Sequence, residues 1–541
     1  MFTDALMVVL KLDLAGEAVS IPAGNVKSWS LDLYPWGFSG RAVFMVSLEK
    51  EKDKVFDAFI DKKKIGVTFS VKPHFIPKGS TVDALQVKGL VTKKSLLREQ
   101  TLERGPLEGN PLLYRVYSID FADPAQVLWP WHRPCDLMVK KSVKDLLEAH
   151  KSADVKLTYE WDLLETVSPM LSLSLGAGDG RASFYDFVCW YVSCNNGVFT
   201  CKAEEGSYTL SSAKKAEGEP LSLDAGDIAS VRVDFPETQR SKVSLLNACS
   251  ENPRTQDVCD NPHGVAGLRR DILERYPLAS DFTARQELEK SRFVLKEHVL
   301  SIEFSRYPMM LLDAGTLVRL KGALWETRLF TEGKTYRVCG MHLDATAQDP
   351  NPVADHSMSF NRYEMRMECR LEGKEDLGIC LPDFIPPVYP FHVEGKIVSE
   401  NGEEDEETYQ IHEDENTSEQ QYRVRIPLWE DQEVKAPFMP FVHTGHFYFP
   451  VYKNARVLVA LDFQRAVIVS CLDWRAEAKI PEDTQGNRIL MGLKTDSRTA
   501  ISHTYENKLP VFTMERLADK DTESIVFSDG NLLIQTFEKK E

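Results

Sequence analysis

Apolar and polar residues alternate with a period of two along most of this chain. The alternation is clear in "KSWSLDLYPW" and "KKIGVTFSVKP" within residues 1–165, and in "NRYEMRMECRLEG" within residues 296–398. Runs of this kind, bounded by turn residues, are typical of β-strands that bury one face. The pattern therefore predicts a mainly β fold with two strand-rich blocks.

Two segments change to a helical period. "SVKDLLEAHK" begins at Ser142, a favourable N-cap, and places Asp145 near the positive end of the helix dipole. In "FYDFVCWYVSCNNG" the apolar residues recur on one helical face, and Asn196 and Gly197 form a C-cap signal. "GLRRDILERY" and "ARQELEKSRFVLKE" also have helical character, so we expect an α+β insertion over residues 166–295.

An acidic stretch, "ENGEEDEETYQIHEDENTSE", follows the second strand-rich block. Half of its residues are Asp or Glu. A segment this charged cannot bury much apolar surface, so we expect a solvated loop over residues 399–420.

The segment 421–475 predicts a small barrel core. In "QYRVRIPLW" Val424 and Ile426 alternate with arginines, and "ARVLVALDFQRAVIVSC" is typical of a tight hairpin in which Gln464 and Arg465 reverse the chain. Short, regular strands continue from residue 476 to 541. The predicted core residues of the barrel are Val424, Ile426, Trp429, Val457, Val459, Leu461, Val467 and Val469.

Composition narrows the function classes. The 541 residues carry a net charge of −17, which disfavours nucleic acid as a partner because a phosphate backbone needs a basic surface. The ten cysteines are scattered, as in a protein made in a reducing cytoplasm. The apolar patch in "MFTDALMVVLKLDLAGE" contains Asp4 and Lys11 and lacks a basic n-region, so we expect a first strand and no signal peptide.

None of the candidate chemical motifs is complete. The loop "GAGDG" at 176–180 is followed by Arg181-Ala182 and lacks the Lys-Ser or Lys-Thr of a phosphate cradle. Cys189, Cys194 and Cys201 lack zinc-site spacing, and His443 and His446 have no acidic or thiolate ligand nearby in sequence. We therefore expect no catalytic, cofactor-binding or metal residues, although paired carboxylates remain open as an alternative.

The order of several segments resembles the VgrG family, the hub–spike proteins of type VI secretion and related contractile injection systems. "QYRVRIPLWED" and "VYKNARVLVALDFQRAVIVSCLDWR" are similar to the OB-fold core of that family, with Gln464-Arg465 in place of its Gly-Asp turn. "KKSVKDLLEAH" and "KTYRVCGMHLDA" resemble upstream family segments, and His342 takes the place of a family histidine that we interpret as structural. Matches in the family's order cover residues 110 to 475.

The resemblance implies an architecture and a role. The fold would be mainly β with an α+β insertion, two tube-like β-barrel domains, an OB-fold barrel and a short C-terminal β-prism. A homotrimer would adapt a six-fold inner tube to a three-fold puncturing spike, with no enzymatic activity. The implied partners are an Hcp-like inner tube protein, a PAAR-like tip protein, baseplate proteins and secreted effectors. The expected domains are 1–165 (first hub barrel), 166–295 (insertion), 296–398 (second hub barrel), 399–420 (acidic loop), 421–475 (OB-fold core) and 476–541 (spike).

The resemblance leaves two other functions open. The chain could be the same part in a phage tail baseplate. In a different class, it could be a β-rich hydrolase of cell-envelope polymers that uses acids of the 400–419 stretch. For the leading interpretation we expect synthesis in the cytoplasm, assembly into an injection particle, and secretion or delivery to a target cell.

Overall fold

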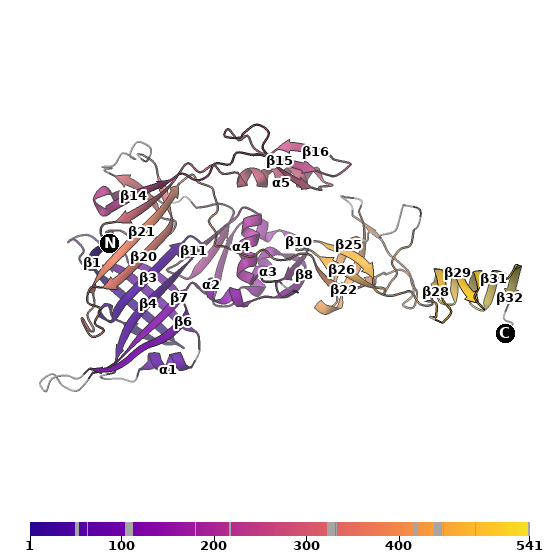
Figure 1. The fold of residues 1–541 in the computed structure, drawn as a ribbon, viewed down its shortest axis with the longest axis horizontal. Coiled ribbons are helices and arrows are strands. Elements are labelled where there is room, and N and C mark those ends of the chain that lie inside the picture. The colour runs from indigo at the N-terminus through magenta and orange to yellow at the C-terminus, as the bar shows by residue number, and fades with distance from the viewer. Residues whose placement is uncertain are drawn as a thin grey trace. The chain divides into compact units, whose positions relative to one another are not determined.

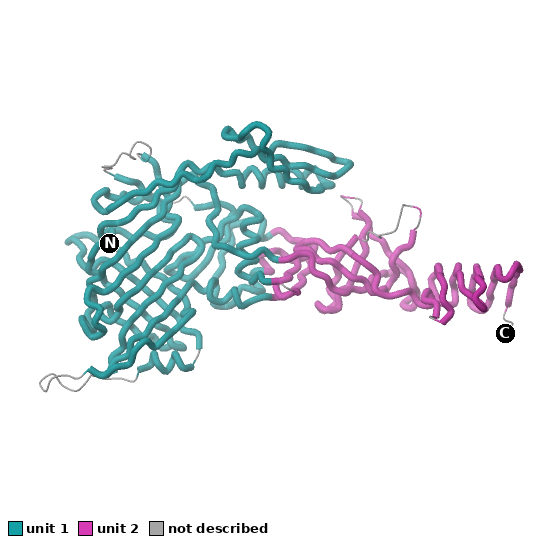
Figure 2. Tube along the Cα trace, in the orientation of Figure 1, with its two compact units in different colours: residues 1–133, 147–165, 181–387 teal, residues 134–146, 166–180, 388–541 magenta. Residues whose placement is uncertain are grey.

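The chain forms two compact units in a computed structural model (Figure 2). The first contains residues 1–133, 147–165 and 181–387, and the second contains 134–146, 166–180 and 388–541. No helix among the described residues is both long and apolar enough to cross a membrane. The structure describes residues 1–48, 53–61, 63–102, 112–178, 180–215, 218–321, 331, 333–414, 417, 419–437, 446, 448–481 and 483–538.

The first unit is built on one 13-stranded sheet in which eight strands close into a ring (Figure 1). The order around the ring is β20-β3-β4-β7-β6-β5-β1-β21, and β21 pairs back with β20. Closure leaves these strands without a free edge. The ring strands are β1 (Phe2–Leu14), β3 (Val26–Tyr34), β4 (Gly37–Ser47), β5 (Ile65–Pro73), β6 (Leu85–Leu102), β7 (Leu112–Ala122), β20 (Tyr336–Ala347) and β21 (Asn361–Gly373).

The ring joins both strand-rich blocks of the sequence. Six of its strands come from the first block, and β20 and β21 come from the second. β20 also pairs with β19, and β21 also pairs with β18, so the same two strands extend the sheet beyond the ring. The mainly β fold class is thus confirmed, and the two blocks form one continuous sheet. The other strands of this sheet are β2 (Glu17–Ile21), β13 (Leu221–Asp224), β14 (Ile228–Asp234), β18 (Val299–Phe304) and β19 (Leu317–Lys321).

Alternation along the ring strands explains its core. In β1, Leu6, Val8, Leu10 and Leu12 are fully buried, and the residues between them are at least partly exposed. These side chains join aromatic residues such as Trp29 and Phe69 in one large apolar cluster. The period of two in the sequence is therefore the signature of an interior filled by side chains.

Helices and small sheets complete the first unit. Ser183 caps α4 with a capping box to Asp186, and Gly197 donates its N–H to the carbonyl of Val192 at the other end, as the sequence predicts. The predicted helix in "GLRRDILERY" is wrong, because residues 269–274 pair in parallel with β15 as strand β17. The elements are α1 (Lys54–Ile60), α2 (Pro124–Leu128), β9 (Lys156–Glu160), α4 (Phe184–Cys194), β11 (Val198–Lys202), β12 (Ser207–Ser211), β15 (Lys242–Asn247), β16 (Arg254–Asp257), β17 (Arg269–Glu274) and α5 (Ala279–Arg292).

The second unit contains a two-stranded antiparallel sheet, a six-stranded sheet and a five-stranded sheet. The two-stranded sheet consists of β8 and β10, which come from far upstream in the sequence, and their Leu137 and Met170 pack into the core of the six-stranded sheet. Helix α3 (Val143–His150) follows β8, and its predicted N-cap pair is present, since Asp145 N–H donates to Ser142 Oγ. The strands are β8 (Cys135–Ser142), β10 (Val167–Ser174), β22 (Phe391–Val398), β23 (His412–Glu413), β24 (Gln420–Ile426), β25 (Gln432–Pro437), β26 (Arg456–Leu461), β27 (Ala466–Cys471), β28 (Gly486–Lys494), β29 (Ser497–Glu506), β30 (Leu509–Ala518), β31 (Asp521–Ser528) and β32 (Asn531–Phe537).

Candidate functional site

The candidate thiols of the sequence are buried or partly buried. Cys189 is fully buried in α4, and Cys194 and Cys201 are partly exposed. Burial raises the pKa of all three thiols above the ordinary value, which disfavours the nucleophilic thiolate. The environment of these cysteines is therefore that of side chains that contribute to packing.

The histidines do not come together as metal ligands. His446 is exposed, and His443 lies outside the described residues. His342 Nδ1 lies 2.7 Å from Asp32 Oδ1, and the two residues face each other across β20 and β3. Within the described part of the chain, no group of three or more His, Cys, Asp or Glu residues has the geometry to hold a metal ion.

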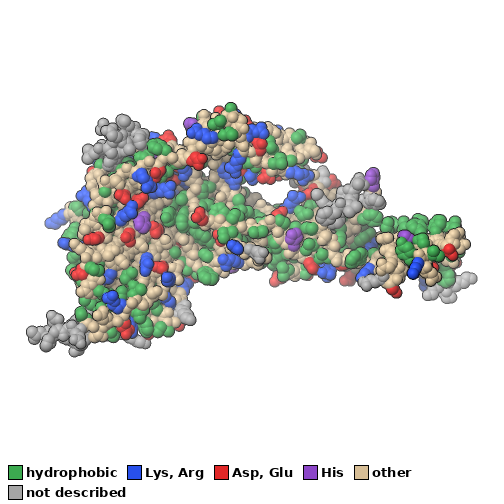
Figure 3. Space-filling view, in the orientation of Figure 1, with side chains coloured by type: hydrophobic (Ala, Val, Ile, Leu, Met, Phe, Trp, Pro, Cys, Tyr) green, Lys and Arg blue, Asp and Glu red, His purple; other side chains and the backbone are tan. Residues whose placement is uncertain are grey.

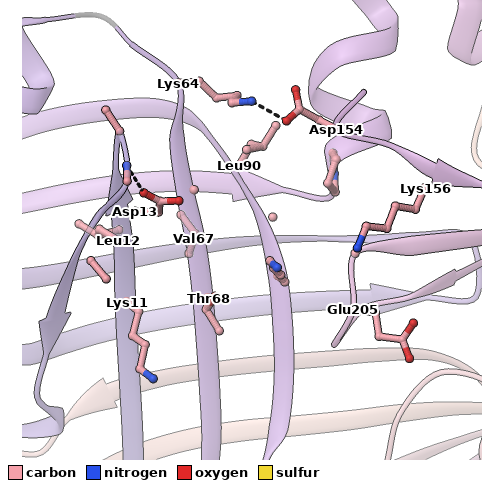
Figure 4. Close-up of a pocket in the computed structure, with 18 of the residues that line it drawn as sticks. Lys11, Leu12, Asp13, Lys64, Val67, Thr68, Leu90, Asp154, Lys156 and Glu205 are labelled. Carbon is pink, nitrogen blue, oxygen red and sulfur yellow. Dashed lines mark hydrogen bonds and ion pairs between the residues drawn. The ribbon is translucent and has the colours of Figure 1, made fainter. Parts of the chain in front are cut away.

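One cavity of the first unit, of about 560 Å³, lies between the ring and β9 (Figure 4). Lysines and acids alternate around it, and two of these, Lys64 and Asp154, form an ion pair of 2.6 Å. Both side chains of this pair are about half exposed. Lys11, Lys88 and Lys156 at the wall are exposed too, so the arrangement is that of a solvated, mixed-charge surface.

The predicted barrel core lies where β22, β24 and β26 pack together. Val424, Ile426, Val457, Val459 and Leu461 are fully buried. Trp429 is half-buried and packs against the same cluster, 6.3 Å from the Phe391 ring.

The second hairpin strand has a different register from the predicted one. Ala466 and Ile468 are buried, whereas Val467 and Val469 are half-buried and lie outside the core cluster. Ala466 lies opposite Leu461 and Ile468 lies opposite Val459, so these two residues share the core face and Val467 between them points to the other face. Val469 has no partner in β26, because the next pair joins Ser470 to Leu458, and Val469 is therefore the extra residue of a bulge.

The turn of this hairpin is also longer than predicted. It contains Asp462 and Phe463 in addition to Gln464 and Arg465. Both added residues leave the ladder to bind the β10 strand. The Asp462 carbonyl accepts from Ser172 Oγ, and the Phe463 carbonyl accepts from Ser172 N–H.

The acidic segment is anchored at several points, although nearly all of its described residues are exposed or partly exposed. Ser399 and Thr408 are buried, and the carbonyl of Thr408 accepts from Lys453 N–H. Its carboxylates pair with distant cations of the same unit. The pairs are Glu400–Arg423, Asp405–Lys494, Glu406–Lys494, Glu407–Arg475 and Glu419–Arg465.

Arg475 is the most buried cation in this set, with a side chain that is 9% exposed. Its guanidinium pairs with Glu407, donates to the carbonyl of Gly492, and lies 4.3 Å above the Tyr452 ring. One side chain thus joins the acidic segment to the first strand of the C-terminal sheet.

We expect Arg475→Ala to destabilise the second unit by about 3 kcal/mol, because it leaves the Glu407 carboxylate without its partner. Calorimetry should show a lower melting temperature for that unit. Arg456→Ala is the matched control, since Arg456 pairs with Glu394 on the exposed surface. An equal decrease in both variants would contradict the anchoring role of Arg475.

The C-terminal sheet has a large apolar face that the described residues of its own chain leave exposed (Figure 3). Cross-strand pairing aligns Ile489, Ile501, Met514, Ile525 and Ile534 in one continuous row. The next row on the same face contains Phe512, Phe527 and Leu532. Of these eight side chains, seven are 37% to 70% exposed, and Ile501 is half-buried.

An apolar patch of this kind marks an interaction surface. The face behind it is more polar, and contains Ser502, Thr513, Glu515 and Gln535. The sheet is therefore two-sided, with one face suited to water and the other to a protein partner.

Comparison with known proteins gives a match in structure. No family model and no curated protein matches the sequence. A chain of the half-lidded Francisella PdpA–VgrG complex aligns with a TM-score of 0.74 and 13% identity, over 98% of this chain and 88% of that one. A chain of the lidless PdpA–VgrG complex aligns with a TM-score of 0.73 and 13% identity, over 99% of both chains.

The lidded form of the Francisella complex gives the same result. One of its chains aligns with a TM-score of 0.73 and 12% identity, over 99% of this chain and 80% of that one. The likeness includes the ringed sheet, the second unit and the C-terminal strands, because nearly all of this chain is covered. In its fold the protein is therefore VgrG-like, with the architecture of a chain of the PdpA–VgrG complex.

Proposed function

We propose that the protein is a structural hub–spike subunit of a contractile injection apparatus. The observation that carries the proposal is the apolar face of the β28–β32 sheet, which this chain leaves in water. Each Å² of apolar surface removed from water contributes about 25 cal/mol. Three copies of this sheet around a common axis would bury the face, which supports a homotrimer with a β-prism spike.

The ringed sheet supports the hub part of the proposal. Each subunit contributes two parts of the sheet, the closed ring and the strands beyond the ring, and the two parts meet at β20 and β21. A trimer would therefore present six such parts, which is the number needed to match a six-fold tube. The ring and the spike together would let the subunit adapt an Hcp-like inner tube to a three-fold tip.

The same proposal includes the partners and the location. A PAAR-like protein would cover the tip, baseplate proteins would surround the hub, and secreted effectors would travel with the particle. The subunit would be made in the cytoplasm and delivered with the particle, without catalytic activity of its own. A phage tail baseplate hub is the same part in another particle, and the neighbouring genes distinguish the two.

Mass measurement across a dilution series tests the proposal. We expect the full chain to be a trimer, and a chain that ends at Arg475 to dissociate at concentrations at least about tenfold higher. The truncated chain should keep the β-sheet signal of its hub. If the full chain is a monomer at every concentration, the spike proposal is wrong. If the full chain and the truncated chain form trimers of equal affinity, the hub alone holds the trimer together and the C-terminal sheet does not contribute.

A further inference from the structure

The second unit contains a cavity of about 1040 Å³ that the proposed hub–spike role does not use. One wall is the two-stranded β8–β10 sheet, at residues 138–141 and 167–170. The opposite wall consists of β24, β25 and the turn at 464–466. The cavity therefore lies between two elements that touch elsewhere, where Leu137 packs into the barrel core.

The charge of this cavity is opposite in sign to that of the whole chain. Five basic and three acidic side chains line it, although the protein carries a net charge of −17. Two of the basic residues are neutralised, since Arg423 pairs with Glu433 at 2.5 Å and Arg465 pairs with Glu419 at 3.5 Å. The other three are Lys140, Lys141 and Lys435.

These three lysines are exposed, and none forms an ion pair with a carboxylate in the described part of the unit. Lys140 has a φ of 54°, in the left-handed region that non-glycine residues rarely adopt. Strained residues of this kind cluster at binding sites, because the fold must hold them in place. Lys140, in the wall formed by β8 and β10, is thus both a cation and one of the non-glycine residues of the chain with a positive φ.

Two polar atoms in the wall lack a partner. His412 Nε2 and Gln432 Oε1 are buried and make no hydrogen bond to the residues that the structure describes. Among the described strands, β8 pairs only with β10 and β25 pairs only with β24. Each of these two wall strands therefore has one edge of backbone N–H and C=O groups without a strand partner.

The lining favours one class of ligand. Apolar side chains are present, including Val139, Val434 and a 63% exposed Val167, and none of the described residues that line the cavity is Phe, Tyr or Trp. Single-stranded nucleic acid is held in OB folds by stacking on aromatic rings, so the described lining does not favour it. An extended peptide instead needs unpaired backbone groups, apolar contacts at alternate residues, and charges that match its side chains.

We propose that this cavity binds an extended acidic peptide segment of a partner protein. Carboxylates of the segment would pair with Lys140, Lys141 and Lys435. The backbone of the segment would satisfy His412 Nε2 and Gln432 Oε1, and its alternate apolar side chains would contact Val167 and Val139.

The test uses the full chain and a labelled peptide of alternating Glu and Val, seven residues long, with fluorescence anisotropy as the readout. We expect saturable binding below about 1 mM, and binding at least about tenfold weaker for the matched Lys–Val peptide. The double variant K140E/K435E should lose at least about tenfold in affinity for the acidic peptide. Q432M should lose several-fold, because Met keeps the size of Gln and removes the acceptor.

The matched control is K78E/K93E, which makes the same charge change at exposed lysines of the first unit and should bind like the wild type. The proposal is overturned if the acidic peptide does not bind, or if both double variants lose affinity equally. It is also overturned if a ten-nucleotide oligothymidylate binds at the same lysines. A change in the mass of the assembly in K140E/K435E would assign the cavity to contacts between copies and overturn the peptide proposal.

Discussion

Val459→Asp should unfold the barrel of the second unit. Val459 is fully buried in the middle of β26, between Val393 of β22 and Ile468 of β27. A carboxylate at this position either stays charged in apolar surroundings or takes up a proton, at a cost of about 3–5 kcal/mol. This approaches the whole stability of a small domain, about 5 kcal/mol or more. Calorimetry of the full chain should show the loss of one transition.

The matched control is Val469→Asp, on the neighbouring strand. Val469 is half-buried and lies outside the core cluster, so the same substitution should shift the melting temperature only slightly. The pair of variants also tests the register of β27, in which Val469 is the unpaired residue of a bulge. If both variants lose the transition, Val469 points into the core and the register of the hairpin differs from the structure.

Met514→Glu should convert the proposed trimer to monomers. Met514 lies at the centre of the apolar row, between Ile501 of β29 and Ile525 of β31. In a trimer three carboxylates would enter the apolar interface, and each would have to be desolvated without a partner. With about 1.4 kcal/mol for every tenfold change, we expect the dissociation constant to rise at least about a thousandfold. Sedimentation equilibrium measures it directly.

Thr513→Glu is the control for this variant. Thr513 is the neighbouring residue of β30, and its side chain lies on the opposite, more polar face of the sheet. The chain should remain a trimer, because that carboxylate stays in water. Dissociation of Thr513→Glu alone would mean that the other face of the sheet forms the spike interior.

Local sequence patterns predict where helices and strands lie better than they predict which strands pair. Alternation identifies β1 and β3, and Ser142 and Ser183 mark the starts of two helices, because these signals depend on residues close in sequence. The pairing of β1 with β21 has no local signal. Two separate strand-rich blocks were therefore the best prediction for what is one sheet.

Prediction of the candidate sites is limited in the same way, because it also depends on contacts between residues far apart in sequence. The buried set around Val424 and Val459 follows from alternation, but the pairing of β26 with β27 places Ala466 and Ile468 in the core in place of Val467 and Val469. The acidic segment has the composition of a solvated loop. Its anchoring depends on Arg475, a cation that follows it by more than fifty residues. Likewise, Lys140 and Lys435 line opposite walls of one cavity although the sequence separates them widely.

The ring can close only after the ribosome has synthesised β20 and β21. Phe2 of β1 pairs with Met365 of β21, and Leu33 of β3 pairs with Met341 of β20. At 5–20 residues per second, the ribosome needs roughly 20–70 s to reach these partners after the first strand appears. During that time the N-terminal strands form an open sheet with two unsatisfied edges, which can pair with another nascent chain. The chain is therefore most exposed to pairing with another copy in the interval before its last ring strand emerges.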